Sequence, residues 1–517
     1  MKVGTKSMTD IQIHSQPQPS PEGGFVARLA SLVFVGYPVK SRFVRSSDQI
    51  QLQFAGLWNM RGTMMTRRVN DPSDDVPSGL PRRRFLQAAG LVGVPLLWSH
   101  AARAADKRRR PKVAVVLTSF THRSHAHVIL ENFLQPYLFN GKPTDPGVDV
   151  VSIYADQFPG GDMTRPVARQ FKIPIYKTIG EALTLGGDKL AVDAVLSIGE
   201  HGSYPKNKLG QKMYPRKRFF DEIVAVMKAS GRYVPLFNDK HLSYRWDWAK
   251  EMVDTCRNLG IPLMAGSSVP LAERRPVLEM PPRAEITEAV SIHGGGVESY
   301  DFHALEVLES MIEGRKGGET GVAEVQFLER DDLLKAGREG RWSIELAGAA
   351  MSVELGKPVT FADGVKQVGR LKHGILIRYR DGLKATILCV SDSGIRWNFA
   401  CRLRGKVKPL ATHFYVGPWN NRNLFKALSH AIQHHFIHGK TPYPVERTLL
   451  VTGILDASMH SRHQKSKPFA TPQLNLSYAP QDFRAMREMG ASWKIITEKT
   501  PPPRGIVPHG LPLKKSG

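Results

Sequence analysis

The chain has 517 residues, more than one typical hydrophobic core encloses, so two or three domains are expected. A hydrophobic content of 41% suits a globular protein, and no apolar run reaches the roughly 18–20 residues that a membrane-spanning helix needs. The formal net charge is +25, but the sequence shows no nucleic-acid-binding motif and the basic surplus is spread along the chain. The charge therefore indicates a basic solvated surface and no nucleic-acid partner.

Residues 1–77 show no sustained period of 2 or 3.6 residues and are rich in Gln, Ser, Pro and Gly. We expect this segment to be disordered, or to be an upstream extension that is not normally translated. In the second case Met60, Met64 or Met65 is the true start, and Met64 or Met65 leaves the short basic region that an export signal needs.

An export signal follows, and we assign it to residues 78–104. The segment Pro81-Arg82-Arg83-Arg84-Phe85-Leu86-Gln87 resembles the twin-arginine consensus, and an apolar core runs from Ala88 to Trp98. Ala102-Arg103-Ala104 then supplies a small-x-small cleavage site. We therefore expect a periplasmic or secreted protein that leaves the cytoplasm already folded and begins at Ala105 once the signal is removed. The alternative is a signal that stays uncleaved as an anchor.

Between residues 111 and 268, short apolar runs alternate with helical segments. The run Val113-Ala114-Val115-Val116-Leu117 is typical of a buried parallel strand, and a helix is expected from about Ser124 to Leu138. Further strands are expected at 148–154, 173–176, 192–198, 233–237 and 262–265, with helices at 164–171, 179–185, 216–230 and 246–259. This order predicts a Rossmann-like, doubly wound parallel sheet, whose ligands bind beyond the carboxyl ends of the strands.

The glycine-rich phosphate loop that is usual in such domains is missing. Thr118, Ser119 and Arg123 follow the first strand, and without glycine the backbone cannot approach a pyrophosphate as closely. The N-terminus of the next helix, aided by these side chains, can still hold an anion. Asp156 ends the second strand, where dinucleotide-binding folds place an acid for the ribose hydroxyls. These four residues are the candidates for cofactor binding.

Residues 269–480 predict a second domain of the α+β class. Segments 324–327, 375–379, 383–390 and 395–403 alternate apolar and polar residues, and Arg380-Asp381-Gly382 marks a hairpin turn. We therefore expect a mixed, largely antiparallel open sheet with one covered face. Residues 481–517 form a C-terminal tail, of which the Pro- and Lys-rich part from Lys499 to Gly517 is expected to be disordered.

Three segments carry a family resemblance. They are Asn238-Asp239-Lys240-His241-Leu242 at a strand end, the glycine-rich turn and helix Gly294–Glu306, and the helices and turn of Phe425–Ala470. Together with the order of elements over residues 112–478, they resemble the Gfo/Idh/MocA oxidoreductases, the relatives of glucose–fructose oxidoreductase and inositol dehydrogenase. In that family the first segment is Glu-Lys-Pro, and the second contains an Asp and a His on one helix.

The resemblance implies hydride transfer from a carbohydrate or polyol to a tightly bound NAD or NADP. By position, Lys240 and His303 match the family's lysine and histidine, which implies acid–base roles at the reacting hydroxyl. The family's aspartate precedes its histidine by four residues, where this chain has Ser299, so Asp301 is the remaining candidate. The resemblance also implies a homo-oligomer formed through the C-terminal sheet.

Several polar residues are expected together at the carboxyl edge of the first sheet. They follow the first, fourth and fifth strands, and they are His122, His125, His127, Glu200, His201 and His241. Glu200, His201, His241 and nearby Tyr204 are candidates for contacting a sugar. A divalent metal on His122, His125 and His201 is the alternative, which the loose spacing disfavours, and it would suit a metal-dependent hydrolase or lyase. A sugar-binding protein without redox chemistry is the other alternative.

The chain has three cysteines, Cys256, Cys389 and Cys401, and no CxxC pair. Cys389 and Cys401 lie in strand-like sequence. A disulfide between them would suit an oxidising compartment, but we expect buried free thiols.

Overall fold

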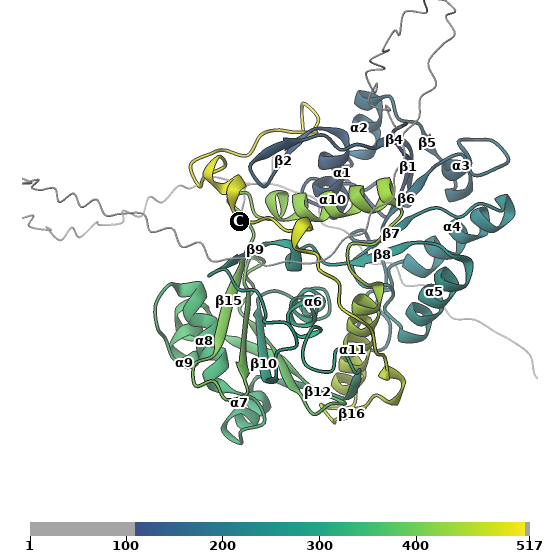
Figure 1. The fold of residues 1–517 in the computed structure, drawn as a ribbon. Coiled ribbons are helices and arrows are strands. Elements are labelled where there is room, and N and C mark those ends of the chain that lie inside the picture. The colour runs from purple at the N-terminus through teal and green to yellow at the C-terminus, as the bar shows by residue number, and fades with distance from the viewer. Residues whose placement is uncertain (1–108, 512–517) are drawn as a thin grey trace, which may run out of the picture. The chain divides into compact units, whose positions relative to one another are not determined.

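The computed structural model describes residues 109–511 (Figure 1). The twin-arginine segment and everything before it lie outside the described residues. Residues 109–511 belong to one compact unit. None of the helices between residues 109 and 511 is long and apolar enough to cross a membrane.

The first sheet has six strands in the order β5-β4-β1-β6-β7-β8, and every neighbouring pair is parallel. Its strands are β1 Lys112–Leu117, β4 Asp149–Ala155, β5 Ile175–Tyr176, β6 Ala194–Ile198, β7 Leu236–Asp239 and β8 Leu263–Gly266. The helices that follow them are α1 His125–Leu134, α2 Thr164–Phe171, α3 Ile179–Thr184, α4 Arg216–Ser230 and α5 Trp246–Leu259. This is the predicted doubly wound arrangement.

Both faces of this sheet are buried, which explains the unbroken apolar run of β1. Val113 and Val115 belong to the same core cluster as Ile129 of α1. Ala114 points to the opposite face, where it joins residues of α3, α4 and α5 such as Phe219. Alternate residues of one strand therefore serve two cores, and no position from Val113 to Leu117 can be polar.

The helix expected over residues 124–138 is shorter than predicted. The helix α1 ends at Leu134, and the chain then forms a small hairpin of β2 Tyr137–Phe139 and β3 Lys142–Thr144. Gln135 is extended because it precedes Pro136, which restricts its backbone and has no N–H to continue the helix. Apolar residues continue beyond Pro136, and for this reason the sequence analysis predicted a helix that is too long.

The second sheet has eight strands in the order β16-β11-β12-β13-β10-β14-β15-β9. Only β10 and β13 pair in parallel among its described strands. The strands are β9 Glu273–Arg275, β10 Ile286–His293, β11 Val322–Glu329, β12 Leu371–Tyr379, β13 Lys384–Val390, β14 Trp397–Leu403, β15 Leu410–Tyr415 and β16 Phe469–Ala470. The predicted fold class, a Rossmann-like sheet plus a mixed and largely antiparallel open sheet, is confirmed.

Both faces of the second sheet are covered, whereas one covered face was expected. Helices α7 Arg330–Arg338, α8 Ile344–Leu355 and α9 Phe361–Val368 form a core of their own against one face, in which Trp342 and Met351 are buried. Helices α6 Asp301–Ile312 and α11 Val445–His463 cover the other face (Figure 1). The prediction was wrong because segment 330–368 was not recognised as helical.

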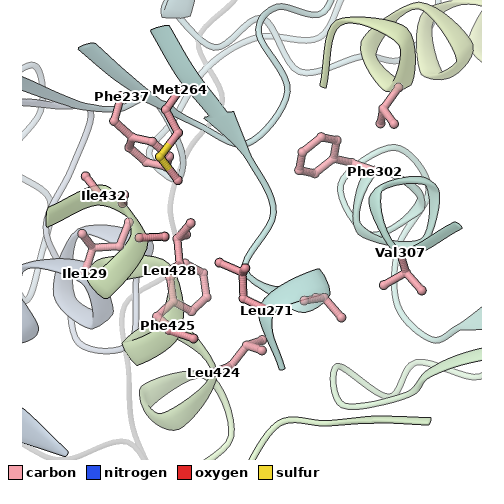
Figure 2. Packing of buried hydrophobic residues seen from close by; sticks show 14 of the residues in the cluster. Ile129, Phe237, Met264, Leu271, Phe302, Val307, Leu424, Phe425, Leu428 and Ile432 are labelled. Atoms are coloured by element: carbon pink, nitrogen blue, oxygen red, sulfur yellow. The ribbon is translucent and has the colours of Figure 1, made fainter. Parts of the chain in front are cut away.

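Helix α10 Asn421–His438 carries the C-terminal part of the chain back to the first domain. Figure 2 shows Phe425, Leu428 and Ile432 of α10 beside Ile129 of α1. Polar contacts add to this packing, because the side-chain amide of Asn132 donates to Ser429 and that of Gln433 donates to the Asn132 carbonyl. The first domain is therefore completed by residues almost 300 positions further along the chain.

The described part of the tail is packed, so the prediction of disorder from Lys499 onward is wrong for residues 499–511. Ile506 and Val507 are buried in the main core cluster. Short 3₁₀ turns, η2 Pro472–Leu474, η3 Arg484–Met486 and η4 Ala491–Lys494, lead toward them, and another, η1 Val269–Leu271, follows β8. The prolines that suggested disorder, residues 501–503, come shortly before the buried residues Ile506 and Val507.

Helices α6 and α11 meet through buried charged groups. The guanidinium of Arg447 donates to the carboxylate of Glu313 at 2.8 Å, and the hydroxyl of Thr448 donates to Glu306 at 2.7 Å. Burial raises the pKa of Glu306 to about 7, against the opposing charge of Arg447. A carboxyl whose pKa is raised in the folded state stabilises the fold fully below its ordinary pKa, and this contribution is lost as the pH rises through the folded value.

We therefore expect the free energy of unfolding to fall between about pH 5 and pH 8, in part because Glu306 must ionise in the core. The substitution Glu306→Gln, which cannot ionise, should reduce that fall by up to about 3 kcal/mol, at 1.36 kcal/mol per pKa unit. Urea unfolding of both proteins at the two pH values measures it. Glu339→Gln, at an exposed position, is the control. Equal pH dependence in wild type and Glu306→Gln would contradict the assignment.

Candidate functional site

A polar cavity of about 430 Å³ lies beyond the carboxyl ends of the parallel strands. The first domain contributes residues that follow β1, β6 and β7, namely Arg123, His125, Glu200, His201, Lys240 and His241. The second domain contributes the turn before α6, the start of that helix, and Trp397 of β14. Helix α10 closes one side with Phe425. This is the edge at which ligands bind on doubly wound sheets.

The backbone around this cavity is held in a conformation that side chains disfavour. Arg123, His201, Lys240 and Glu298 all line the cavity, and their φ angles are 67°, 71°, 70° and 67°. Left-handed backbone at residues other than glycine costs free energy and persists where the surrounding structure imposes it. Four such residues from four separate segments make this cavity the candidate functional site.

A buried pair of charges organises the floor of the cavity. Arg216, the first residue of α4, donates to the carboxylate of Glu200 at 2.5 Å and contacts Nε2 of His241 at 3.0 Å. Because a guanidinium can only donate, Nε2 of His241 is an acceptor and carries no proton. The ammonium of Lys240 lies 3.7 Å from the other oxygen of Glu200 and donates to the Ser299 carbonyl at 3.0 Å.

These contacts determine the charge states of Glu200, Lys240 and His241. The positive charges of Lys240 and Arg216 outweigh burial and hold the pKa of Glu200 far below its usual range, so this carboxylate stays charged. Burial lowers the pKa of Lys240, although Glu200 opposes the shift. Burial, with the charge of Arg216, also lowers the pKa of His241 well below its usual value. A lysine with a lowered pKa is suited to acid–base work near neutral pH.

His303 faces Lys240 across the cavity from the second domain. It is 7% exposed, its Nδ1 lies 2.7 Å from the hydroxyl oxygen of Ser267, and its ring packs edge-on against Trp397. The ring of Tyr300 stacks parallel to that of Trp397, with 5.8 Å between the ring centroids. Burial and the charge of Lys240 lower the pKa of His303 well below its usual value, so the imidazole is neutral at neutral pH.

His125 has the carboxylate partner that orients catalytic imidazoles. Its Nδ1 lies 2.7 Å from Asp239, which is buried at the end of β7. Its ring lies 5.3 Å from that of His201, whose pKa burial lowers to about 4. Glu298 lines the opposite wall, accepts a hydrogen bond from the Lys212 backbone, and has its pKa raised to about 7 by burial. Several groups able to exchange protons thus surround one space.

Asp301 does not join this group. It is fully buried at the start of α6, where one carboxylate oxygen contacts His373 at 2.8 Å and the other accepts from the Glu298 backbone at 2.8 Å. Among the three residues expected to be catalytic, the structure brings Lys240 and His303 to the cavity and places Asp301 behind its wall. Ser299, which stands where the family resemblance requires the acid, supplies only its backbone carbonyl to Lys240.

Of the four residues expected to bind a cofactor, only Arg123 lines the cavity. Thr118 and Ser119 are buried, and the hydroxyl of Thr118 donates to the Glu200 carbonyl at 2.6 Å. Asp156 accepts hydrogen bonds from the hydroxyls of Tyr154 and Tyr204 at 2.7 and 2.6 Å, and pairs with Arg218. Tyr204, expected to contact a sugar, therefore binds Asp156.

These contacts test whether a dinucleotide fits. At the nicotinamide end the residues fit, because Lys240 and His303 flank a polar space at the strand ends and Arg123 precedes the N-terminus of α1. At the ribose end the acid is present, but two tyrosine hydroxyls donate to it as ribose hydroxyls would. A dinucleotide could therefore use Asp156 only after Tyr204 had released it, and the structure does not line the cavity with this acid.

The histidines considered as metal ligands do not form a ligand set among the described residues. His122 packs against His127 at 5.1 Å between ring centroids, and His127 is buried with its Nδ1 accepting from the Arg123 backbone. His125 and His201 remain in the cavity as polar wall residues. All three cysteines are free and buried, as expected.

Sequence reasoning missed Arg216, Glu298 and the aromatic pair of Tyr300 and Trp397 as parts of the site. Arg216 opens an ordinary amphipathic helix, and nothing in its spacing separates it from the basic residues that follow. Gly199 was the available signal, because a Cβ there would lie 2.6 Å from Cγ of Arg216. A glycine at the end of a buried strand indicates that another group approaches the backbone closely.

The comparisons with known proteins were made on sequence and on structure. No family model matches the sequence, and no curated protein matches it. The structure is similar to GenD2 from gentamicin A biosynthesis in complex with NAD, at 13% identity and a TM-score of 0.44 over 74% of this chain and 99% of that one. It is also similar to a Lactobacillus casei myo-inositol dehydrogenase in complex with NAD(H) and myo-inositol, at 11% identity and a TM-score of 0.45 over 73% and 100%. A probable dehydrogenase from Thermotoga maritima aligns at 10% identity and 0.42 over 70% and 99%.

The close approach at Gly199 gives a direct test of the site's floor. Gly199→Ala should displace Arg216 and destabilise the protein by about 1–3 kcal/mol, because an added methyl group in a filled core forces its neighbours to move. Gly160→Ala is the matched control, since a Cβ there meets nothing within 4 Å. Urea unfolding of the three proteins measures the difference. Equal stability of the two variants would show that Arg216 is not fixed against β6.

Proposed function

We propose that this protein is an oxidoreductase that acts on a carbohydrate or polyol, with NAD or NADP as the hydride acceptor. The observation that carries the proposal is that Lys240 and His303, which come from different domains and are 3% and 7% exposed, line one polar cavity. These are the two residues to which the resemblance to Gfo/Idh/MocA oxidoreductases assigns acid–base chemistry. The buried, strained surroundings are those of a site and not of a solvated surface.

The wall of the cavity suits a polyhydroxylated ligand. Glu200 and Glu298 offer oxygens that accept from hydroxyl groups, while Lys212 and Asn421 offer donors. Tyr300 and Trp397 add flat apolar surface that can pack against the C–H face of a sugar ring. A cavity of about 430 Å³ whose wall is polar and apolar in about equal parts is better matched to a small polyhydroxylated substrate than to a lipid or a peptide.

The chain's own residues would move the proton of the substrate hydroxyl. Lys240, with its lowered pKa, would hydrogen-bond that hydroxyl and exchange its proton while Glu200 stabilises the charged form of the amine. His303 would hold the same oxygen through the ring nitrogen that Ser267 leaves free. NAD or NADP would supply the hydride acceptor. Arg123 and the N-terminus of α1 would hold its phosphates, and Asp156 would hold its ribose.

The assignment is tested by nucleotide content and by turnover. Protein purified from its native compartment and then denatured should release stoichiometric NAD or NADP, detected by absorbance and mass. Lys240→Met should lower turnover on a polyol substrate at least 100-fold while nucleotide binding stays intact, because only the proton-transfer group is lost. His303→Gln should act similarly.

Lys228→Met is the control for these variants, since Lys228 is exposed on α4. Turnover by Lys240→Met at the wild-type rate would refute the role of Lys240. Absence of released nucleotide, together with no binding on titration with NAD or NADP, would refute the redox proposal itself.

A second candidate function is favoured by one specific observation. Asp156 already has both carboxylate oxygens engaged by Tyr154, Tyr204 and Arg218, and the loop that would hold the phosphates has no glycine. A protein that binds sugars at the same cavity without redox chemistry would keep this arrangement permanently. In that case the ligand reaches Lys240 and His303, and Asp156 serves only to hold Tyr204 and the loop after β6.

Tyr204 separates the two candidates. Under the redox proposal Tyr204→Phe should tighten NAD or NADP binding about tenfold, because the hydroxyl that competes for a charged acceptor is removed. Isothermal titration of the nucleotide measures this, with exposed Tyr233→Phe as the control. If Tyr204→Phe binds no nucleotide but retains affinity for sugars, the second candidate holds.

We also propose that the protein is exported folded by the twin-arginine route and acts outside the cytoplasm. The support is the order of arginine pair, apolar core and cleavage site in residues 78–104. A nucleotide is scarce outside the cytoplasm, so a redox enzyme there must bind its cofactor tightly before export. The nucleotide-release measurement therefore bears on both proposals.

A further inference from the structure

Three side chains on neighbouring strands of the second sheet form a row at one level. His373 of β12 stands opposite Cys389 of β13, and Cys389 stands opposite His293 of β10. Because side chains alternate between the two faces of a sheet, residues directly opposite one another lie on the same face. The row therefore places two imidazoles and a thiol side by side on the face that α6 covers.

The row is dry and tight. His293, His373 and Cys389 are at most 1% exposed. One ring nitrogen from each histidine and the sulfur all lie within 4.8 Å of one another. Among residues 109–511 they form the group of His, Cys, Asp or Glu side chains whose atoms are arranged to share a metal ion. Imidazole and thiolate are the ligands that zinc prefers in structural sites.

The carboxylate of Asp301, the first residue of α6, contacts two members of the row. Oδ1 of Asp301 lies 2.8 Å from Nε2 of His373 and 2.9 Å from Nε2 of His293. The first contact is a hydrogen bond, whereas Nε2 of His293 makes none despite its proximity to the carboxylate. One carboxylate oxygen thus contacts both histidines but lies outside the group whose ligand atoms are within 4.8 Å of one another. Asp301 would complete a four-coordinate set with two histidines and one cysteine once its side chain moved closer to the Cys389 sulfur.

The unpartnered nitrogen points to a cation. Nδ1 of His293 lies 3.0 Å from the Gly294 carbonyl oxygen, which can only accept, so Nδ1 carries the proton. In the neutral ring Nε2 then presents a lone pair, fully buried and 2.9 Å from a carboxylate oxygen. Two acceptors at that distance repel, so either a second proton on this imidazole or a bound metal ion must be present. A histidine whose other nitrogen donates to a backbone carbonyl is also the usual arrangement in metal sites.

We propose that His293, His373, Cys389 and Asp301 bind one divalent transition-metal ion, zinc by the chemistry of the ligand set. The ion replaces the Cys389 proton, so the sulfur binds as thiolate and gives up its hydrogen bond to the Gly295 carbonyl. It joins three strands of the sheet to the first residue of α6. That helix carries His303, and the turn before it carries Tyr300, so the ion has a structural role behind the candidate active site. The inference does not rest on the proposed function.

The test uses the whole mature protein. Dialysis against a chelator followed by titration with Co²⁺ should give one equivalent bound, with a thiolate-to-cobalt charge-transfer band in the near ultraviolet. Elemental analysis after reconstitution with zinc should give one zinc per chain. Zinc should also raise the unfolding temperature of the metal-free protein by several degrees, because the folded state alone offers the four ligands together.

Two cysteine variants make the test specific. Cys389→Ser should abolish the charge-transfer band and lower the affinity for zinc at least 100-fold. Cys401→Ser should leave both unchanged, since Cys401 is equally buried on the neighbouring strand β14 and lies outside the group. His373→Gln, which keeps a hydrogen-bonding side chain, provides a second ligand variant should Cys389→Ser fold poorly.

Three results would overturn the proposal. One is wild-type protein that takes up no zinc or cobalt and is not stabilised by either ion, which would leave the four side chains as an ion-free hydrogen-bond network. Another is a charge-transfer band that survives Cys389→Ser or is lost in Cys401→Ser. The last is unchanged zinc affinity in a folded His373→Gln protein. Each is independent of nucleotide binding and turnover.

Discussion

The buried ion pair between Arg216 and Glu200 is the contact on which the candidate site depends. Both charges are buried, with side-chain exposures of 1% and 7%, so loss of one partner would leave a poorly compensated charge at a cost of about 3–5 kcal/mol. The pair fixes the carboxylate that makes a buried ammonium at Lys240 tolerable, and it fixes the protonation of His241. Gly199 is the residue that lets Arg216 reach this position.

This arrangement joins two domains that carry different parts of the chemistry. The parallel sheet delivers Lys240, Glu200 and His125 on loops that follow strands, where the backbone can be strained locally without disturbing a core. The second sheet delivers His303 through α6, a helix that is buried almost along its whole length. These groups thus face a buried helix, which would keep the candidate acid–base groups Lys240 and His303 in fixed relation to a substrate.

Much of the fold could be predicted because local pattern and tertiary environment agree. The bounds of α2, α4 and α5 match the sequence prediction residue for residue, since each helix has a clear apolar stripe and the last two are followed by a glycine. Prediction failed where the pattern was neutral. Helix α8 is apolar on nearly all sides, so its sequence shows no helical period of apolar and polar residues. Strand β10 was not predicted because its sequence mixes charged and apolar residues.

The site could be predicted only as far as strand ends reveal it. Lys240, Glu200 and His201 follow buried strands, so topology alone places them at one edge of the sheet. The partners that decide their behaviour come from elsewhere in the chain, as Arg216 does for Glu200 and Tyr204 does for Asp156. A linear sequence does not show which hydroxyl or guanidinium will occupy a given carboxylate, because that depends on how each loop closes.

The return of α10 to the first domain has a consequence for the order of events in the cell. Asn132 of α1 donates a hydrogen bond to Ser429, which lies 297 residues further along the chain. A ribosome must therefore make most of the chain before α10 can pack against the first domain. Until then the nascent protein exposes apolar surface and depends on protection from aggregation. The first domain can therefore reach its final packing only after α10 has been made. A secretion route that threads unfolded chains would have to rebuild that long-range pairing on the far side of the membrane, whereas one that carries finished proteins would not.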